Sequence, residues 1–280
     1  MKKLTILMIL MAIYSFNYVN IFSKEVKVVS YNIRYNNPND DKDIWKNRRS
    51  TIVDFISIQS PDFIGLQEVT YSQLLYLNSN LSGYDYVGVG RDDGKKKGEF
   101  SPIYFNQSNY DLKISNTFWL SETPENISVG WDAAMERICT YGLFVQKISG
   151  RKVWVFNTHF DHIGNIAREK SVDLILRKIN DLTKTNDYII ITGDFNLTDD
   201  SSPIIKIQKL YNDANFNIDK QSDFYGTFNN FQLDSNSKKR IDYVFYKNFI
   251  LIESKHGNVK TNMGRWASDH HPVISKFNFL

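Results

Sequence analysis

Acidic, amide and imidazole side chains stand at the ends of segments whose composition is typical of β-strands. Asn32 follows VVSY, Glu68 ends FIGLQE, His159 ends VWVFNTH, Asp194 and Asn196 follow YIIITG, Asp242 opens the strand in RIDYVF, and Asp269 and His270 precede PVISKF. In layered α/β proteins, ligands bind in the crevice at the ends of the strands. We therefore expect these side chains to converge on one site.

The residue types in this set suit a hard metal ion and a phosphate group. Carboxylate and amide oxygens are the ligands that Mg²⁺ or Mn²⁺ prefer. A histidine beside an aspartate can act as a general base or stabilise a phosphate. Together they predict metal-assisted hydrolysis of a phosphate ester. The single cysteine, Cys139, excludes an internal disulfide and a cysteine-based zinc site, and a tetrahedral zinc centre is disfavoured.

Strands and helices alternate at both ends of the chain. Strands are predicted at 26–33, 62–69, 84–89, 102–106, 111–120, 138–148, 152–159, 188–192, 241–246 and 272–277, and helices at 43–58, 72–80, 166–182 and 203–211. The continuous apolar run at 188–192 is typical of a strand buried on both faces. This order, with hairpins in the middle of the chain, favours a layered α/β fold with a mixed sheet system.

The 280 residues are 42% hydrophobic and 23% charged, which excludes a disordered, collagen-like or coiled-coil chain. Two lysines and an apolar run through Phe16 predict a signal peptide at 1–23. The alternative is an uncleaved membrane anchor, but Asn17 and Asn20 interrupt the apolar run before it is long enough to span a membrane. We therefore expect no stable membrane span after processing. We expect a secreted or periplasmic protein, with one domain over 24–280 because no repeat or linker divides it.

The charge balance speaks against a dedicated binder of long nucleic acids. The full chain has 34 basic and 31 acidic residues, and removal of 1–23, with two lysines, leaves 32 and 31. Basic residues cluster only at 95–97 and 238–240. Proteins that bind duplex DNA usually carry a clustered basic face.

Six short motifs occur in one order along nearly the whole mature chain. They are SYNIR (30–34), LQEV (66–69), NTHFDH (157–162), GDFN (193–196), RIDYVF (240–245) and SDHHPV (268–273). In this order they resemble the endonuclease/exonuclease/phosphatase superfamily, which contains DNase I-like nucleases, sphingomyelinases and inositol polyphosphate 5-phosphatases. The resemblance implies a four-layer α/β sandwich, with two mixed β-sheets packed face to face and helices outside, and a monomer.

The resemblance also implies a metal site. Glu68 matches the principal carboxylate ligand of a Mg²⁺ or Mn²⁺ ion, and Asn32 belongs to the same metal site, where it helps to hold that carboxylate and the phosphate. Asp269 contacts a second metal or the histidine network. Whether one or two metals act stays open.

Catalytic roles follow from the same match. Asp194 orients or deprotonates the attacking water, Asn196 contacts a metal or phosphate oxygen, and His159 stabilises the phosphate. Asp242 orients His270, which binds the scissile phosphate or acts as the acid or base. The implied reaction is in-line attack of water on phosphorus.

Segments at 88–105, 118–125, 130–141 and 157–171 resemble a secreted bacterial subgroup of this superfamily, and we expect them to form the substrate wall. The candidate substrate-binding residues are Arg137, Trp131, Glu99, His162 and Arg168. Trp131 could instead fill the core, and Arg168 could be a surface residue of a first helical turn. His271 is expected to be structural, and His256 to lie in a surface loop.

The predicted function is hydrolysis of phosphodiester bonds, as in nucleases. The first alternative is a phosphatase or phosphodiesterase acting on a small phosphorylated metabolite, a sugar phosphate or a lipid headgroup. The second alternative is a non-catalytic binding protein on the same fold. The presence of Glu68, Asp194 and His270 speaks against the second alternative.

Overall fold

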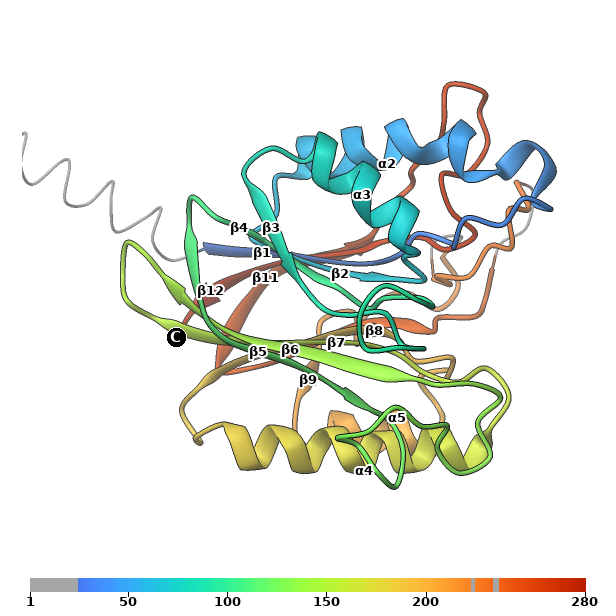
Figure 1. The fold of residues 1–280 in the computed structure, drawn as a ribbon. Coiled ribbons are helices and arrows are strands. Elements are labelled where there is room, and N and C mark those ends of the chain that lie inside the picture. Colours follow the sequence, from blue (N-terminus) through green and yellow to red (C-terminus); the bar gives the residue numbers. More distant parts are fainter. Residues whose placement is uncertain (1–24, 223–224, 234–236) are drawn as a thin grey trace, which may run out of the picture.

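Two six-stranded β-sheets stack face to face in the computed structural model, with helices on both outer faces (Figure 1). The structure describes residues 25–222, 225–233 and 237–280. The signal peptide predicted at 1–23 lies outside these residues and stays a prediction. Within the described ranges, no helix is long and apolar enough to cross a membrane.

The first sheet is built around a parallel pair of strands. Its order is β11 (Phe249–His256), β12 (Val273–Phe279), β1 (Glu25–Asn32), β2 (Phe63–Gln67), β4 (Ile103–Asn106) and β3 (Tyr84–Val87). Strands β1 and β2 are parallel, and β12 and β4 flank them antiparallel. The short helix η1 (Asp41–Asp43) and α2 (Trp45–Gln59) connect β1 to β2. A capping box between Thr70 and Gln73 begins α3 (Tyr71–Asn80) directly after the β2 motif.

The second sheet repeats this plan. Its order is β5 (Tyr110–Trp119), β6 (Ile138–Gln146), β7 (Lys152–His159), β8 (Tyr188–Asp194), β10 (Asp242–Lys247) and β9 (Asn212–Asp213). Strands β7 and β8 are parallel and are joined through α4 (Asn165–Leu182). A shorter helix, α5 (Ser202–Gln208), follows β8. Each sheet therefore contains a central β–α–β unit flanked by antiparallel strands.

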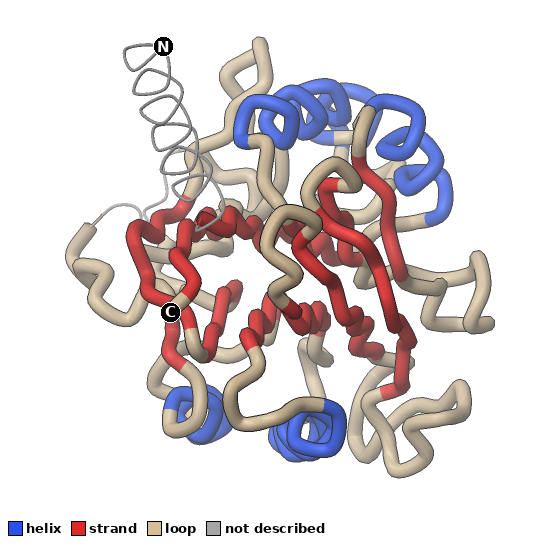
Figure 2. The backbone as a smooth tube through the Cα atoms, turned by 90° about the vertical axis from the view of Figure 1, so that its left-hand side faces the viewer, coloured by secondary structure: helices blue, strands red, loops and turns tan. Residues whose placement is uncertain are grey.

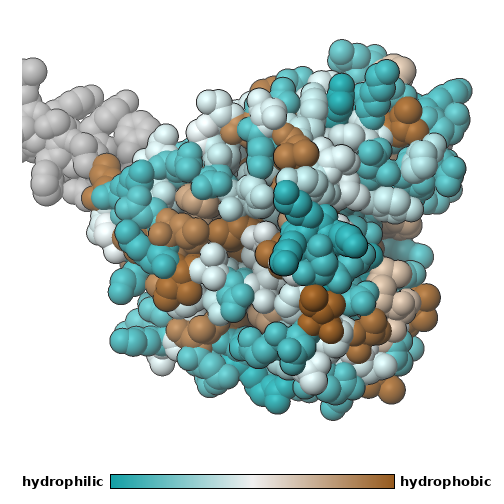
Figure 3. Space-filling view, viewed as in Figure 1, coloured by the Kyte–Doolittle hydropathy of each residue, from teal (hydrophilic) through white to brown (hydrophobic). Residues whose placement is uncertain are grey.

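Apolar side chains fill three layers. Helices α2 and α3 bury Ile52, Ile56, Leu74 and Leu77 against β1 and β2, and α4 and α5 bury Val172, Ile175, Ile204 and Ile207 against the second sheet. Between the sheets lie Phe63, Phe105, Phe144, Val155 and Phe277. Figure 2 shows the four layers from the side, and Figure 3 shows hydrophobic residues at the surface where the two sheets meet. The predicted four-layer α/β sandwich is confirmed.

A polar seam joins the two sheets near one edge of the sandwich. Asn157 on β7 donates to the backbone oxygen of Leu66 at 2.7 Å and accepts a hydrogen bond from Gln67 Nε2 at 2.7 Å. A β-carbon at Gly65 would lie 2.0 Å from Thr192 Oγ1, so only glycine permits this close approach of the sheets. All five residues are buried, and the seam fixes how the sheets align beside the strand ends.

The sequence analysis missed two strands, the two-residue β9 and the longer β11. Strand β11 pairs only with β12 at the edge of its sheet, so Ile250 and Ile252 are about half exposed and its segment lacks a clear in–out pattern. The prediction that His256 lies in a surface loop is wrong. His256 is the last residue of β11 and is buried.

Candidate active site

The motif residues lie at one edge of the sandwich because of strand direction. The parallel pairs β1–β2 and β7–β8 present their carboxyl ends there, which carry Asn32, Glu68, His159 and Asp194. The antiparallel strands β10 and β12 begin at the same edge, where Asp242 is the cross-strand partner of Asp194. These side chains line or underlie a cleft of about 810 Å³. The predicted convergence of the strand ends is therefore observed.

Asn32 links the carboxylates of the two sheets. Its Nδ2 lies 3.0 Å from Glu68 Oε1 and 3.0 Å from Asp194 Oδ2, while its Oδ1 accepts the backbone N–H of Arg34 at 2.9 Å. The backbone donor fixes which end of the amide faces the acids. Asn32 thus donates hydrogen bonds that orient Glu68 and Asp194, which agrees with the expectation that it helps to hold the metal-binding carboxylate.

Asp242, His270 and Asp194 form a buried chain of charged groups. His270 Nδ1 lies 2.8 Å from Asp242 Oδ2, and His270 Nε2 lies 3.7 Å from Asp194 Oδ2. Burial alone would lower the pKa of His270, but Asp242 and then Asp194 outweigh it and raise the pKa well above its usual value. Burial, followed by repulsion from Asp242, raises the pKa of Asp194 to about 7. This arrangement favours a protonated imidazole at neutral pH.

His159 is held on the other side of Asp194. Asn196 Nδ2 lies 3.2 Å from His159 Nε2 and 3.0 Å from the backbone oxygen of Phe160, and Asn196 N donates to Asp194 Oδ1 at 3.0 Å. Burial, followed by the positive charge of Arg137, lowers the pKa of His159 well below its usual value. Because the Asn196 amide donates to Nε2, the neutral ring carries its proton on Nδ1. Its Nδ1 is buried and faces the Glu99 carboxylate, with 3.8 Å between Nδ1 and Glu99 Oε2.

The carboxylates of Glu68 and Asp269 fit a hard divalent cation. Both line the cleft, and Arg34 lies beside them, with its Nη1 4.0 Å from Glu68 Oε2 and 3.8 Å from Asp269 Oδ2. Glu68 has a positive φ of 61°, a conformation that costs energy outside glycine and that occurs at functional sites. Asp194, Asp242 and His270 form a second group whose ligand atoms lie within 4.8 Å of one another. The donor set therefore fits one or two metals, with Glu68 and Asp269 as the carboxylate ligands of the first.

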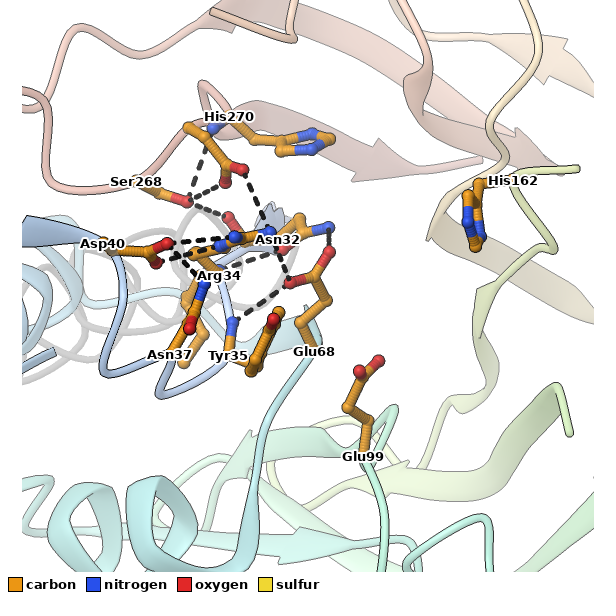
Figure 4. Close-up of polar contacts among 12 residues, drawn as sticks. Asn32, Arg34, Tyr35, Asn37, Asp40, Glu68, Glu99, His162, Ser268 and His270 are labelled. Atoms are coloured by element: carbon orange, nitrogen blue, oxygen red, sulfur yellow. Dashed lines mark hydrogen bonds and ion pairs between the residues drawn. The ribbon is translucent and has the colours of Figure 1, made fainter. Parts of the chain in front are cut away.

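Sequence reasoning missed Arg34, although it belongs to the first motif. Its guanidinium makes two hydrogen bonds of 3.0 Å to Asp40, as Figure 4 shows. Its Nη1 also lies within 4.0 Å of the carboxylates of Glu68 and Asp269. Asp40 comes from the loop after β1, where the sequence gives no periodic signal. The end of the strand was visible in the sequence, but the loop that folds back over it was not.

Three of the five predicted substrate-binding residues line the cleft. They are Glu99, Arg137 and His162. Arg91, which the sequence analysis did not select, joins them by pairing with Glu99 at 2.9 Å. The arginine could have been suspected from its place in segment 88–105, which was already expected to form the substrate wall.

Trp131 and Arg168 do not reach the cleft. Trp131 packs partly against the hydrophobic cluster beneath α4 and lines a separate surface depression. Arg168 is buried, and it donates to the backbone oxygen of Asp161 at 3.0 Å. Arg168 therefore holds the loop after β7 and does not contact substrate, because its guanidinium is hydrogen-bonded to the backbone of that loop.

His271 is structural, as expected. Its ring packs edge-on against Trp266 at 4.6 Å, and Asn229 Nδ2 lies 3.5 Å from its Nε2. Burial, and then the neighbouring His256, lower the pKa of His271 to about 4. The folded protein therefore keeps this ring neutral in mildly acidic solution.

Replacing His271 with glutamine is expected to reduce the loss of stability on acidification from pH 8 to pH 5 by about 2 kcal/mol. The unfolded chain protonates this histidine near pH 6.5, whereas the folded chain does so near pH 4, so its contribution disappears as the pH falls through that window. Urea unfolding of the wild type and the variant at pH 8 and pH 5 measures this change in the free energy of unfolding. The same substitution at the exposed His162 is the control, and an unchanged pH dependence in His271→Gln would contradict the prediction.

Comparisons of the sequence and the structure with known proteins identify relatives of this chain. The model of the endonuclease/exonuclease/phosphatase family matches residues 29–270. The structure of an endonuclease/exonuclease/phosphatase from Bacteroides vulgatus is 34% identical, with a TM-score of 0.84 over 91% of this chain and 99% of that chain. A mannosyl-6-phosphatase of Bacteroides thetaiotaomicron is 35% identical, with a TM-score of 0.83 over 91% and 100% of the two chains. A probable RNA exonuclease of Saccharomyces cerevisiae is 26% identical over 180 residues, which are 59% of this chain and 34% of that protein.

Proposed function

Because the chain belongs to the endonuclease/exonuclease/phosphatase family, whose model covers 29–270, we propose that it is a divalent-metal-dependent phosphoesterase acting on a small phosphorylated metabolite. The observation that carries this proposal is the cleft in which Glu68, Asp194 and His270 meet. A metal-binding carboxylate, a water-orienting carboxylate and a protonated imidazole are the groups that hydrolysis of a phosphate ester requires. A binding protein without catalysis would not need all three.

Each of the residues of this site then has a defined role in the reaction. When bound between Glu68 and Asp269, a divalent ion would supply positive charge for the phosphoryl oxygens. Asp194 orients the attacking water, and its pKa near 7 lets it take up a proton as the water attacks. The imidazolium of His270, oriented by Asp242, donates a hydrogen bond to a phosphoryl oxygen, and His159 lines the same cleft beside Asp194.

Three observations support a small ester in place of the predicted nucleic acid. The cleft volume of about 810 Å³ falls within the usual range for small-molecule sites. Lys95, Lys96 and Lys97 are exposed, but Arg240 of the second basic cluster is buried and pairs with Asp213 at 2.8 Å, so that cluster is not a free cationic patch. The similarity to a mannosyl-6-phosphatase extends over nearly the whole chain.

Phosphodiester cleavage stays the second candidate. It is favoured by the similarity to a probable RNA exonuclease, which covers a minor part of that larger protein. Lys239 also lines the cleft, which adds a cation for a further phosphate of a polynucleotide.

Parallel assays of the mature chain, 24–280, and of its His270→Ala variant distinguish the two candidates. We expect Mg²⁺-dependent release of phosphate from sugar phosphates or p-nitrophenyl phosphate that His270→Ala lacks, and no nicking of plasmid DNA or degradation of RNA. A phospholipid substrate tests the lipid-headgroup alternative in the same format. Nicking of plasmid that depends on His270, without turnover of small esters, would contradict the proposal and favour the nuclease.

A further inference from the structure

Beside the metal-binding carboxylates, one wall of the cleft consists of polar side chains with fixed hydrogen-bonding roles. Glu99 precedes β4, Arg137 precedes β6, and His162 follows β7, and all three line the cleft. Figure 4 shows His162 apart from Glu68 and His270, with Glu99 nearer to Glu68. The mechanism proposed above uses none of these three side chains.

Glu99 is a positioned hydrogen-bond acceptor. Its carboxylate receives two hydrogen bonds from the guanidinium of Arg91, at 2.9 and 3.2 Å. The backbone of Arg91 is itself fixed, because its N–H donates to Glu99 O at 3.1 Å and its oxygen accepts Trp119 Nε1 at 2.8 Å. Four hydrogen bonds therefore hold the carboxylate in place, and its oxygens can accept further hydrogen bonds from a ligand.

Arg137 and His162 are positioned hydrogen-bond donors. Arg137 is only 4% exposed, and its Nε lies 3.5 Å from the carboxylate of Asp161. Its Nη2 lies 3.1 Å from His162 Nδ1, and a guanidinium can only donate, so the neutral His162 ring accepts at Nδ1 and carries its proton on Nε2. Within the described chain, the buried Nη1 of Arg137 has no hydrogen-bond partner. This wall thus presents donors beside an acceptor.

The charges of this wall cancel. Arg91 pairs with Glu99, and Arg137 pairs with Asp161, so no net charge is left to bind a second phosphate or a cationic headgroup. The aromatic rings that line the cleft belong to the other wall, where Tyr35, Phe228 and Phe231 contact Arg34, His270 and Arg48. A neutral group rich in hydroxyls fits a wall that has paired charges and no phenyl or indole ring among its described residues.

Building on the proposed function, we propose that Glu99, Arg137 and His162 bind the hydroxyl groups of the alcohol part of the substrate. The enzyme then selects a polyol phosphate, such as a sugar phosphate, over esters that lack hydroxyls. A β-bridge between Val69 and Phe100, with hydrogen bonds of 2.7 and 3.3 Å, joins the neighbours of Glu68 and Glu99. This bridge fixes the spacing between the phosphate end of the cleft and the hydroxyl-binding wall.

The test compares two primary phosphomonoesters of six carbons each, a hexose 6-phosphate, which is rich in hydroxyls, and n-hexyl phosphate, which has none. The measured quantity is the ratio of their kcat/KM values. We expect the ratio to favour the hexose phosphate by about 100-fold or more in the wild type, and to fall about tenfold or more in Glu99→Gln and in His162→Ala, because each loses a hydrogen bond. Glu136→Gln, whose side chain does not line the cleft, is the matched control and should keep the wild-type ratio.

The possible results separate this inference from the proposed function. A wild-type ratio near one, or a ratio unchanged in both variants, overturns the hydroxyl-binding wall while hydrolysis of both esters still supports the phosphoesterase. A wild type that hydrolyses neither ester overturns both proposals. Circular dichroism melting of each variant confirms that the altered ratio does not come from unfolded protein.

Discussion

Replacing His270 with alanine is expected to lower kcat for a phosphate ester by about 10²–10⁴-fold, the usual contribution of a positioned acid or base. The imidazole lies between Asp242 and Asp194 and is protonated at neutral pH because these carboxylates raise its pKa. Its loss removes a charged donor from the phosphoryl oxygens, whereas the strands that carry it stay paired. Steady-state kinetics with Mg²⁺, together with thermal melting of both proteins, measure the effect.

The Asp242→Asn variant tests the same role of His270 through the dependence of kcat on pH. The carboxylate of Asp242 raises the pKa of His270, so its removal lowers that pKa. The alkaline limb of kcat against pH should therefore move to lower pH in the variant, since the imidazole then loses its proton earlier. His271→Gln, next in sequence, is the control for local disturbance. Equal activity in wild type and His270→Ala would refute the catalytic role of His270.

Removal of divalent metal is the second large effect. We expect EDTA to abolish turnover and Mg²⁺ or Mn²⁺ to restore it, because the carboxylates of Glu68 and Asp269 line the cleft and present the oxygen ligands that a hard divalent ion prefers. Glu68→Gln should weaken Mn²⁺ binding about 100-fold or more in a calorimetric titration, since a negative ligand is lost. Binding is measured without substrate, so the result does not depend on the reaction.

The matched control for the metal test is Glu169→Gln, an exposed glutamate on α4. It should bind Mn²⁺ as the wild type does. Full activity after exhaustive dialysis against EDTA, or wild-type Mn²⁺ affinity in Glu68→Gln, would rule out the metal assignment. Restoration by Zn²⁺ alone would contradict the choice of a hard ion.

Strand ends could be predicted from the sequence because their signal is local. An apolar run followed by an acid or amide marks both the strand and the side chain at its end, as at Asn32 and Asp194. The edge strand β11 carries no such signal, since half of its side chains face solvent. Residues that depend on a distant partner could not be assigned either. Arg34 is held in the site by its ion pair with Asp40, and Arg91 by its ion pair with Glu99. Neither pairing is visible in the sequence.

Trp131 and Arg168 show a second limit of prediction from the sequence, because both were expected to contact substrate and neither lines the cleft. Both lie in segments that do form the substrate wall, but sequence position does not fix the direction in which a side chain points. Arg168 follows the loop of His162 by less than two helical turns, yet its guanidinium lies beneath Asp161. The direction depends on the packing of α4 against β7, which only the folded chain shows.

Hydrogen bonds tolerate less misalignment than apolar contacts, and the stacked sheets use one kind at each end. Beside the cleft, Asn157, Gln67 and the Asn32–Asp194 pair connect the sheets through directional bonds. At the far end, where β1, β2 and β7 begin, contacts such as those among Phe63, Phe105 and Phe144 are apolar. We therefore expect substitutions among the apolar contacts of the far end to disturb the register of the catalytic carboxylates less than substitutions in the polar seam do.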